Sequence, residues 1–245
     1  ITGKPYDTLE EIVGLRGNGN GSLKEFNISY KHVDLTSEGR IDFEAVKQSI
    51  KPETKMIGIQ RSKGYAARPS FTIAEIKEMI DFVKEIKSDV VVFVDNCYGE
   101  FVERQEPCHV GADLMAGSLI KNPGGGLAKT GGYIVGKKEY VKACSYRLTS
   151  PGIGAEAGAS LYSLQEMYQG FFLAPHVVGQ ALKGAQFTSA FLEAIGMNTF
   201  PKWNEQRTDL IQAVQFDNSE LMVSFCQAIQ YASPVNSHVT PYPNY

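Results

Sequence analysis

The stretch Val90-Val-Val-Phe-Val-Asp95 decides the fold of this chain: five apolar residues in a row that end on an acid. Two similar apolar runs follow, over 112–117 and 131–136, and a glycine cluster (Gly124, Gly125 and Gly126) lies between them. Apolar runs of four to eight residues between turn signals are typical of strands buried on both faces. We therefore expect these three runs to be neighbouring strands of one sheet.

Helical and strand patterns alternate on the amino-terminal side of this stretch. The apolar run 55–60 predicts a buried strand, and Thr72 caps an amphipathic helix whose apolar residues recur at helical spacing. Strands that alternate with helices indicate parallel βαβ units, so we predict an α/β fold with a mostly parallel sheet. We also expect helices over 5–13, 42–50, 137–147, 154–194 (broken at Pro175) and 220–231, and strands over 27–33 and 207–216.

The composition narrows the class of protein. A chain of 245 residues that is 43% hydrophobic and 21% charged can bury a full core. The net charge of −3 provides no basic surface for nucleic acid, so we expect no nucleic-acid partner. No apolar run is long enough to span a bilayer, and the four cysteines lie far apart. We expect a cytoplasmic protein with reduced thiols and no membrane partner.

Asp95 and Lys121 are the main candidate site residues. Lys121 follows Asp95 by 26 positions, and each comes at or just after the end of a predicted strand. Ligands of α/β sheets bind beyond the carboxyl ends of the strands. Pyridoxal 5'-phosphate requires both groups: a partly desolvated lysine with a lowered pKa forms its Schiff base, and a carboxylate keeps its pyridine nitrogen protonated. We therefore predict a pyridoxal-phosphate site there.

Ser118 is the candidate phosphate ligand, because its hydroxyl lies three residues before Lys121. The glycines after Lys121 would let the backbone pass close to the cofactor. Simpler interpretations stay open at this point: Lys121 as a surface lysine, Asp95 as a turn former and Ser118 as a partner of the backbone.

Two other kinds of site agree poorly with the sequence. The segment 124–130 superficially resembles a phosphate loop, but the two required glycines would fall at Pro123 and Ala128. Asp95, Cys97, Cys108 and His109 are close in sequence, yet their spacing matches no compact zinc pattern. We predict no nucleotide site and no metal site.

The central motifs resemble a known family. Val92-Phe-Val-Asp-Asn-Cys-Tyr-Gly-Glu-Phe101 and Ser118-Leu-Ile-Lys-Asn-Pro-Gly-Gly-Gly126 are similar to the aluminium-resistance or methionine γ-lyase-like proteins. These proteins belong to the cysteine/methionine-metabolism group of fold-type I pyridoxal-phosphate enzymes. The opening segment 2–11 also resembles that family, so the similarity covers nearly the whole chain.

The resemblance implies specific roles for three residues. Lys121 would be the catalytic Schiff-base lysine, Asp95 the partner of the pyridine nitrogen and Ser118 a phosphate ligand. It also implies that residues 1–245 form a three-layer large domain, the cofactor-binding part of a longer protein. That fragment would lack an amino-terminal segment, which supplies a phosphate contact and a residue packing on the ring, and most of a small carboxyl-terminal domain.

The activity implied by the resemblance is carbon–sulfur lyase chemistry on a small cysteine- or methionine-like amino acid. Such enzymes share their sites across subunit interfaces, so we expect a homodimer or homotetramer to which residues 154–196 contribute. The alternative is a non-catalytic relative that keeps the fold and serves in stress response, such as metal resistance, or in assembly.

Overall fold

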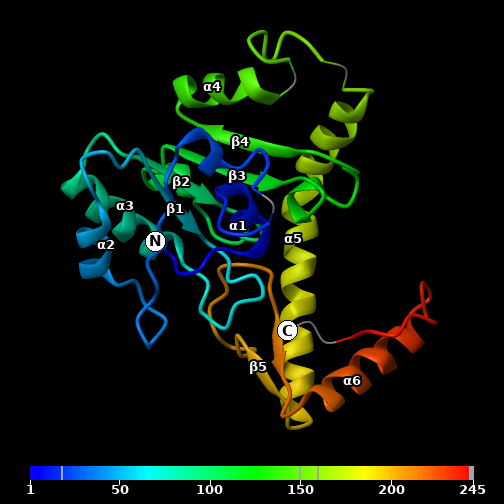
Figure 1. The fold of residues 1–245 in the computed structure, drawn as a ribbon. Coiled ribbons are helices and arrows are strands. Elements are labelled where there is room, and N and C mark those ends of the chain that lie inside the picture. Colours follow the sequence, from blue (N-terminus) through cyan, green and yellow to red (C-terminus); the bar gives the residue numbers. More distant parts are fainter. Residues whose placement is uncertain (18, 149, 159, 243–245) are drawn as a thin grey trace. The chain divides into compact units, whose positions relative to one another are not determined.

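The structure is a computed structural model that describes residues 1–245 except 18, 149, 159 and 243–245 (Figure 1). The chain forms two compact units. The first consists of Ile1–Leu182 together with Arg207–Ile211, and the second of Lys183–Gln206 and Gln212–Tyr245. The short segment Arg207–Ile211 therefore belongs to the first unit, although both of its neighbours belong to the second.

A four-stranded sheet is the centre of the first unit. Its strands are β1 (Met56–Gln60), β2 (Val91–Asp95), β3 (Leu114–Ser118) and β4 (Gly132–Gly136), in the order β1-β2-β3-β4. β1 pairs with β2 and β2 with β3 in parallel, whereas β3 and β4 are antiparallel. The predicted α/β fold with a mostly parallel sheet is confirmed. Because the register pairs Gln60 with Asp95 and Asp95 with Ala116, the carboxyl ends of β1, β2 and β3 meet at one edge.

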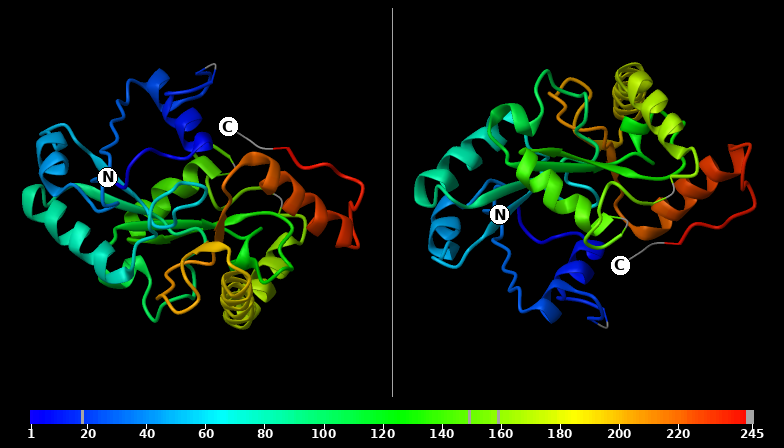
Figure 2. Two further views of the ribbon diagram at one scale, coloured as in Figure 1. Left: turned by 90° about the horizontal axis from the view of Figure 1, so that it is seen from below. Right: turned by 90° about the horizontal axis from the view of Figure 1, so that it is seen from above.

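Helix α3 (Ile73–Ile86) covers one face of this sheet. Its amino terminus carries the predicted cap: the Thr72 hydroxyl accepts a hydrogen bond from the Glu75 N–H, and the Glu75 side chain accepts one from the Thr72 N–H. One side of the helix packs against the sheet in the hydrophobic core, which includes Ile57, Ile59, Ile76, Met79, Ile80, Val83, Val92, Val94 and Met115. Figures 1 and 2 show α2 (Phe43–Ser49) beside α3 near β1, while α4 (Lys138–Leu148) lies near β4.

The remaining elements are α1 (Asp7–Val13), α5 (Ser163–Ala194), α6 (Ser219–Ala232), the two paired strands β5 (Asn198–Phe200) and β6 (Ala213–Gln215), and the short 3-10 helices η1 (Leu23–Phe26), η2 (Pro107–Val110) and η3 (Asn122–Gly124). β5, β6 and α6 belong to the second unit. The Asn218 side chain caps the start of α6, since it accepts a hydrogen bond from the Leu221 N–H at 2.9 Å.

Two predicted elements, the strand over 27–33 and the helix over 154–194, are wrong in whole or in part. The segment 27–33 alternates in polarity but forms no strand, because no other strand pairs with it among the described residues. Pro175 lies inside a continuous α5 and does not break it; a helix of 32 residues is held by many neighbouring hydrogen bonds, so the loss of one is tolerated. The described residues 154–158 and 160–162 form an isolated bridge, turns and irregular backbone in place of the predicted helix, and Leu161 and Tyr162 have positive φ angles.

The predicted strand over 207–216 is also largely wrong, because only Ala213–Gln215 is a strand. The preceding segment Arg207–Ile211 makes long-range contacts in place of strand pairing. The Asp209 carboxylate accepts hydrogen bonds from the hydroxyls of Ser62 (at 2.6 Å) and Ser70, and the Leu210 N–H donates to the Tyr98 carbonyl at 3.1 Å. These contacts hold the segment at the carboxyl edge of the sheet.

Candidate active site

Asp95 is the last residue of β2 and lies at the carboxyl edge of the sheet. The Arg61 N–H donates to its carbonyl at 3.0 Å, which continues the β1–β2 pairing beyond Gln60. The Cys97 N–H donates to carboxylate Oδ1 of Asp95 at 3.1 Å. That bond orients the carboxylate at the edge of the sheet.

Lys121 lies three residues after the end of β3, immediately before η3. Its Nζ lies 4.2 Å from the centroid of the Tyr98 ring, within the range of a cation–π contact. Its side chain also interacts with the Cys97 thiol. The Cys97 thiol and the Tyr6 phenol each lie close enough to both Asp95 and Lys121 to feel the charges of these two groups. The fold therefore brings Asp95 and Lys121 together around Cys97 and Tyr6.

The ionisation of these side chains differs from expectation in one respect. Burial by itself lowers the pKa of Lys121, but the interactions with Cys97 and Tyr98 outweigh it, so the pKa is raised above the ordinary lysine value. The lowered lysine pKa expected from partial desolvation is therefore wrong for the cofactor-free protein. Burial, followed by the nearby Asp95 carboxylate, raises the pKa of the Cys97 thiol to about 11. At neutral pH the Cys97 thiol is therefore protonated.

Ser118 is the last residue of β3 and pairs with Gly132 of β4. Residues two apart on a strand lie on the same face, and Ala116 is the register partner of Asp95, so Ser118 and Asp95 lie on the same face of the sheet. The Ser118 hydroxyl forms no hydrogen bond within the part of the chain that the structure describes. It is available to bind a ligand beside the Lys121 turn.

The glycines after Lys121 have a packing role. A Cβ at Gly124 would lie 1.6 Å from the Leu119 carbonyl oxygen, and one at Gly125 would lie 2.3 Å from the Gly170 carbonyl oxygen of α5. Gly125 also has a φ of 61°, which disfavours other residues. These two glycines are therefore required by the tight turn and by the approach of α5.

Three residues at this site were not found from the sequence as site residues: Tyr6, Cys97 and Tyr98. Tyr6 precedes α1 and is far from Asp95 in sequence, so no local pattern predicts their contact. Cys97 and Tyr98 are in the loop after β2, where α/β proteins carry functional residues. Their position after the strand, inside the motif Val92–Phe101, was the available signal.

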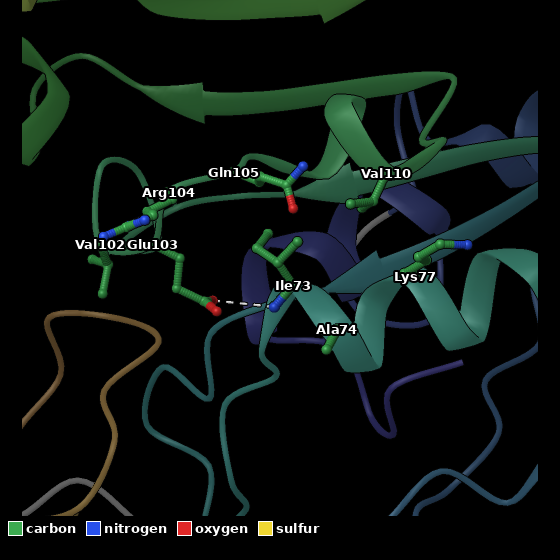
Figure 3. Close-up of a pocket in the computed structure, with 8 residues that line it drawn as sticks. All are labelled: Ile73, Ala74, Lys77, Val102, Glu103, Arg104, Gln105 and Val110. Atoms are coloured by element: carbon green, nitrogen blue, oxygen red, sulfur yellow. Dashed lines mark hydrogen bonds between the residues drawn. The ribbon is translucent and has the colours of Figure 1, made fainter.

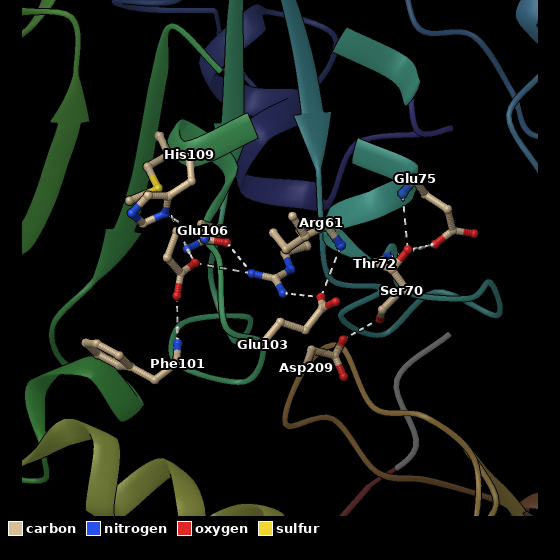
Figure 4. A network of polar contacts seen from close by, with 12 residues as sticks. Arg61, Ser70, Thr72, Glu75, Phe101, Glu103, Glu106, His109 and Asp209 are labelled. Atoms are coloured by element: carbon tan, nitrogen blue, oxygen red, sulfur yellow. Dashed lines mark hydrogen bonds and ion pairs between the residues drawn. The ribbon is translucent and has the colours of Figure 1, made fainter. Parts of the chain in front are cut away.

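Arg61 organises the loop that carries Cys97 and Tyr98 (Figure 4). Its side chain is 0% exposed and forms ion pairs with Glu103 at 2.8 Å and Glu106 at 3.4 Å. Its Nη1 also donates to Asn96 Oδ1 at 2.8 Å. A Cβ at Gly99 would lie 2.6 Å from the Arg61 guanidinium group, so the loop backbone packs directly on this side chain. Arg61 thus supports the site from inside the protein.

Glu100 lies on the other face of the sheet. It is 4% exposed, and its Oε1 accepts a hydrogen bond from the Tyr133 hydroxyl at 2.8 Å. A Cβ at Gly117 would lie 2.2 Å from this oxygen, which explains why glycine precedes Ser118. Burial raises the pKa of Glu100 to about 7, and the nearby carboxylates of Glu106 and Asp95 contribute in the same direction.

The raised pKa of Glu100 predicts a pH dependence of stability. Its folded-state pKa of about 7 is above the ordinary value of 4.5, so the folded protein binds this proton more tightly than the unfolded chain. The resulting stabilisation is complete below about pH 4.5 and is lost as the pH rises through about 7. Glu100→Gln should reduce this loss by roughly 2 kcal/mol. Urea unfolding at pH 5 and pH 8 measures the difference in unfolding free energy between the two pH values.

The exposed Glu78 provides the control for that experiment. Glu78→Gln should leave the difference in unfolding free energy between the two pH values unchanged. An equal pH dependence in Glu100→Gln and in the parent protein would contradict the assignment of this proton to Glu100.

A hollow on the surface lies at the amino-terminal end of α3 (Figure 3). It is lined by Ile73, Ala74, Lys77, Val102, Glu103, Arg104, Gln105 and Val110. None of Asp95, Ser118 and Lys121 borders it, so this hollow is not part of the candidate site.

Fold and site together define an α/β protein whose polar groups gather beyond the carboxyl ends of parallel strands. The chain belongs to the methionine gamma-lyase family, whose model matches residues 1–245. The resemblance found in the motifs is thereby confirmed, and with it membership of a family of carbon–sulfur lyases.

Similar proteins cover the whole chain. The protein YnbB of Bacillus subtilis (strain 168) is 74% identical over 246 residues, which are 100% of this chain and 58% of YnbB. A crystal structure from Bacillus cereus is 79% identical with a TM-score of 0.94, and covers 100% of this chain and 60% of its own. The structure of a carbon-sulfur lyase involved in aluminum resistance from Clostridium novyi is 46% identical with a TM-score of 0.91, over 99% and 58% of the two chains.

This chain therefore spans about three fifths of the length of these relatives. A cystathionine gamma-lyase from Lactobacillus plantarum shares the fold at 18% identity, with a TM-score of 0.61 over 89% of this chain and 56% of its own. Within the described residues, no helix combines the length and apolar character needed to cross a membrane.

Proposed function

We propose that this protein is a pyridoxal-phosphate-dependent carbon–sulfur lyase that acts on a cysteine- or methionine-type amino acid. Its sheet would be part of the three-layer large domain of a fold-type I enzyme, with Lys121 as the catalytic residue. One observation carries the proposal: the Lys121 amine and the Asp95 carboxylate share the neighbours Cys97 and Tyr6 at the carboxyl edge of the sheet.

The side chains present agree with the requirements of this cofactor. The Asp95 carboxylate, oriented by the Cys97 N–H, would pair with a ring nitrogen. Ser118 offers a hydroxyl on the same face of the sheet, suitable for a phosphate oxygen. Tyr6 is 40% exposed and lies near Asp95, so its ring would be available to pack beside a bound aromatic group. A ring-packing residue is thus available within this chain, in its first ten residues.

When bound, pyridoxal phosphate supplies a protonated ring that withdraws electrons from the α-carbon of an amino acid. The residues of this chain would position and assist that chemistry. Asp95 would hold the ring nitrogen, and Ser118 would bind the phosphate. Lys121 would act as the base that takes the proton from the α-carbon once its amine is released, after which sulfur leaves as a thiol.

The assembly is a further part of the proposal. Helix α5 exposes large apolar side chains along its first half, including Tyr168 and Phe172. Burying such residues against another subunit would remove apolar surface from water. We propose that the protein forms a homodimer or homotetramer. We also propose a cytoplasmic location and no nucleic-acid or membrane partner. Light scattering of the full-length protein measures the mass of the assembly and so tests the proposed oligomeric state.

Covalent trapping tests the proposed function directly. Full-length protein with pyridoxal phosphate should show a visible absorption band, and borohydride reduction should fix one cofactor on Lys121. Peptide mass spectrometry locates the adduct. Lys129 provides a matched control, since it lies eight positions further on and its side chain is 82% exposed; Lys129→Ala should leave the band intact. No band, or an adduct elsewhere than Lys121, would favour a non-catalytic role in stress response or assembly.

A panel of sulfur amino acids then defines the reaction. Release of a keto acid and a thiol from cysteine, cystathionine or methionine would identify the substrate. The carbon skeleton of the keto acid distinguishes elimination at the β-carbon from elimination at the γ-carbon.

A further inference from the structure

Tyr98 has an unusual place in the candidate site. Its ring lies under the Lys121 amine, with Nζ 4.2 Å from the ring centroid. Its backbone has a φ of 72°, in the left-handed region that residues with a Cβ rarely adopt. Backbone strain of this kind persists only where surrounding structure enforces it, and it is concentrated at functional sites.

Two sets of contacts enforce the conformation of Tyr98. On one side, the Tyr98 carbonyl accepts a hydrogen bond from the Leu210 N–H at 3.1 Å, and Leu210 is held by the neighbouring Asp209 through Ser62 and Ser70. On the other side, the Gly99 N–H donates to the Asn96 carbonyl at 3.0 Å, and the Asn96 side chain is bound to Arg61 at 2.8 Å.

These contacts come from segments that are remote in sequence. Ser62 and Asp209 are 147 positions apart, and Arg61 and Asn96 are 35 apart. All of them lie in the first unit. None of these contacts involves Lys121. Together they fix the position of the Tyr98 ring.

We propose that Tyr98 is a positioning residue for Lys121: the face of its ring holds the Lys121 amine at the carboxyl edge of the sheet before the cofactor enters. The segment Arg207–Ile211 and the Arg61 cluster fix that ring in place. This proposal rests on the proposed function in taking Lys121 as the catalytic amine. It assigns to Tyr98 the task of keeping that amine at the carboxyl edge of the sheet, where Asp95 ends β2.

The ring, and not simply a bulky side chain, is the critical feature. A cation is attracted by the face of Trp, Tyr or Phe, and most strongly by Trp, whereas an aliphatic side chain provides only volume. Tyr6 and Cys97 are also near the amine, and they are unchanged in all variants of position 98. A leucine at position 98 would leave Lys121 desolvated without the compensating ring.

The test uses full-length protein from which pyridoxal phosphate has been removed, with Tyr98→Phe, Tyr98→Leu and Tyr98→Trp compared with the parent. Lysines are methylated with ¹³C-formaldehyde, and the Lys121 signal is assigned by its absence from Lys121→Arg. The NMR titration then gives the apparent pKa of Lys121. Phe, Leu and Trp all carry a Cβ, so they share the backbone strain of Tyr98 and differ only in the ring.

We expect the Lys121 pKa to be highest in Tyr98→Trp, lower in Tyr98→Phe and lowest in Tyr98→Leu, where it should be clearly below that of the parent protein. Equal pKa values of Lys121 in the Leu and Phe variants would overturn the proposal. If Tyr98→Leu does not fold, the comparison of Trp with Phe decides, because a ring contact requires the higher pKa for Trp. No cofactor is bound during the titration, so failure here differs from failure of the borohydride experiment.

Discussion

Lys121→Ala should reduce the rate of carbon–sulfur bond cleavage by at least about 10³-fold, because a positioned general base alone contributes roughly 10²–10⁴-fold and the covalent attachment of the cofactor is lost as well. Steady-state release of keto acid by the full-length protein measures the effect. The fold should be retained, since Lys121 precedes a short 3-10 helix and is outside the hydrophobic core.

Two comparisons make this prediction specific. Lys121→Arg keeps a positive charge over the Tyr98 ring but cannot form the covalent linkage, so it should be as inactive as Lys121→Ala. Added methylamine should restore part of the activity of Lys121→Ala, because a small amine can enter the space left by the side chain. Activity of Lys121→Ala within tenfold of the parent would contradict the assignment.

Arg61→Ala should lower the free energy of unfolding by about 3–5 kcal/mol, the range typical of breaking a buried ion pair. Arg61 is 0% exposed, and its removal leaves Glu103 and Glu106 without their shared cation in a mostly buried place. Its loss also empties a large volume beside Gly99. Urea unfolding of the full-length protein at neutral pH measures the difference.

The matched control at this position is Arg61→Met, which fills much of the same volume without a charge. It should cost less than Arg61→Ala, and the difference separates lost packing from lost charge. Arg104→Ala, at an exposed position of the same loop, should change stability by less than about 0.5 kcal/mol. A loss below about 1 kcal/mol in Arg61→Ala would show that the cluster contributes little to folding.

Local signals in the sequence predicted the central elements well. Val90–Asp95 is uninterrupted in its apolar character and short, so a buried strand is the only regular structure it favours. The Thr72 and Glu75 pair fixed the start of α3, because a capping box depends on residues three apart and not on tertiary context. Where a helix or strand buries one whole face, its hydrophobic periodicity predicted its ends to within one or two residues.

The failed predictions share a cause. The segment 27–33 alternates in polarity, but a strand needs a partner, and partners are decided by the fold as a whole. Pro175 should weaken a helix, yet the length of α5 on both sides outweighs the single lost hydrogen bond. Residues 207–211 favour no regular structure by themselves and are placed by the hydroxyls of Ser62 and Ser70.

The sequence by itself determined the mostly parallel sheet and the placement of Asp95, Ser118 and Lys121 at strand ends, because strand periodicity and chain direction are local properties. Only the tertiary structure decided what surrounds the Lys121 amine. Tyr6 reaches it from the start of the chain, and Tyr98 is turned toward it by Leu210 and by the Arg61 cluster. The pKa of Lys121 depends on these neighbours, and the electrostatic field of a site is set by distances in space that no spacing along the chain encodes.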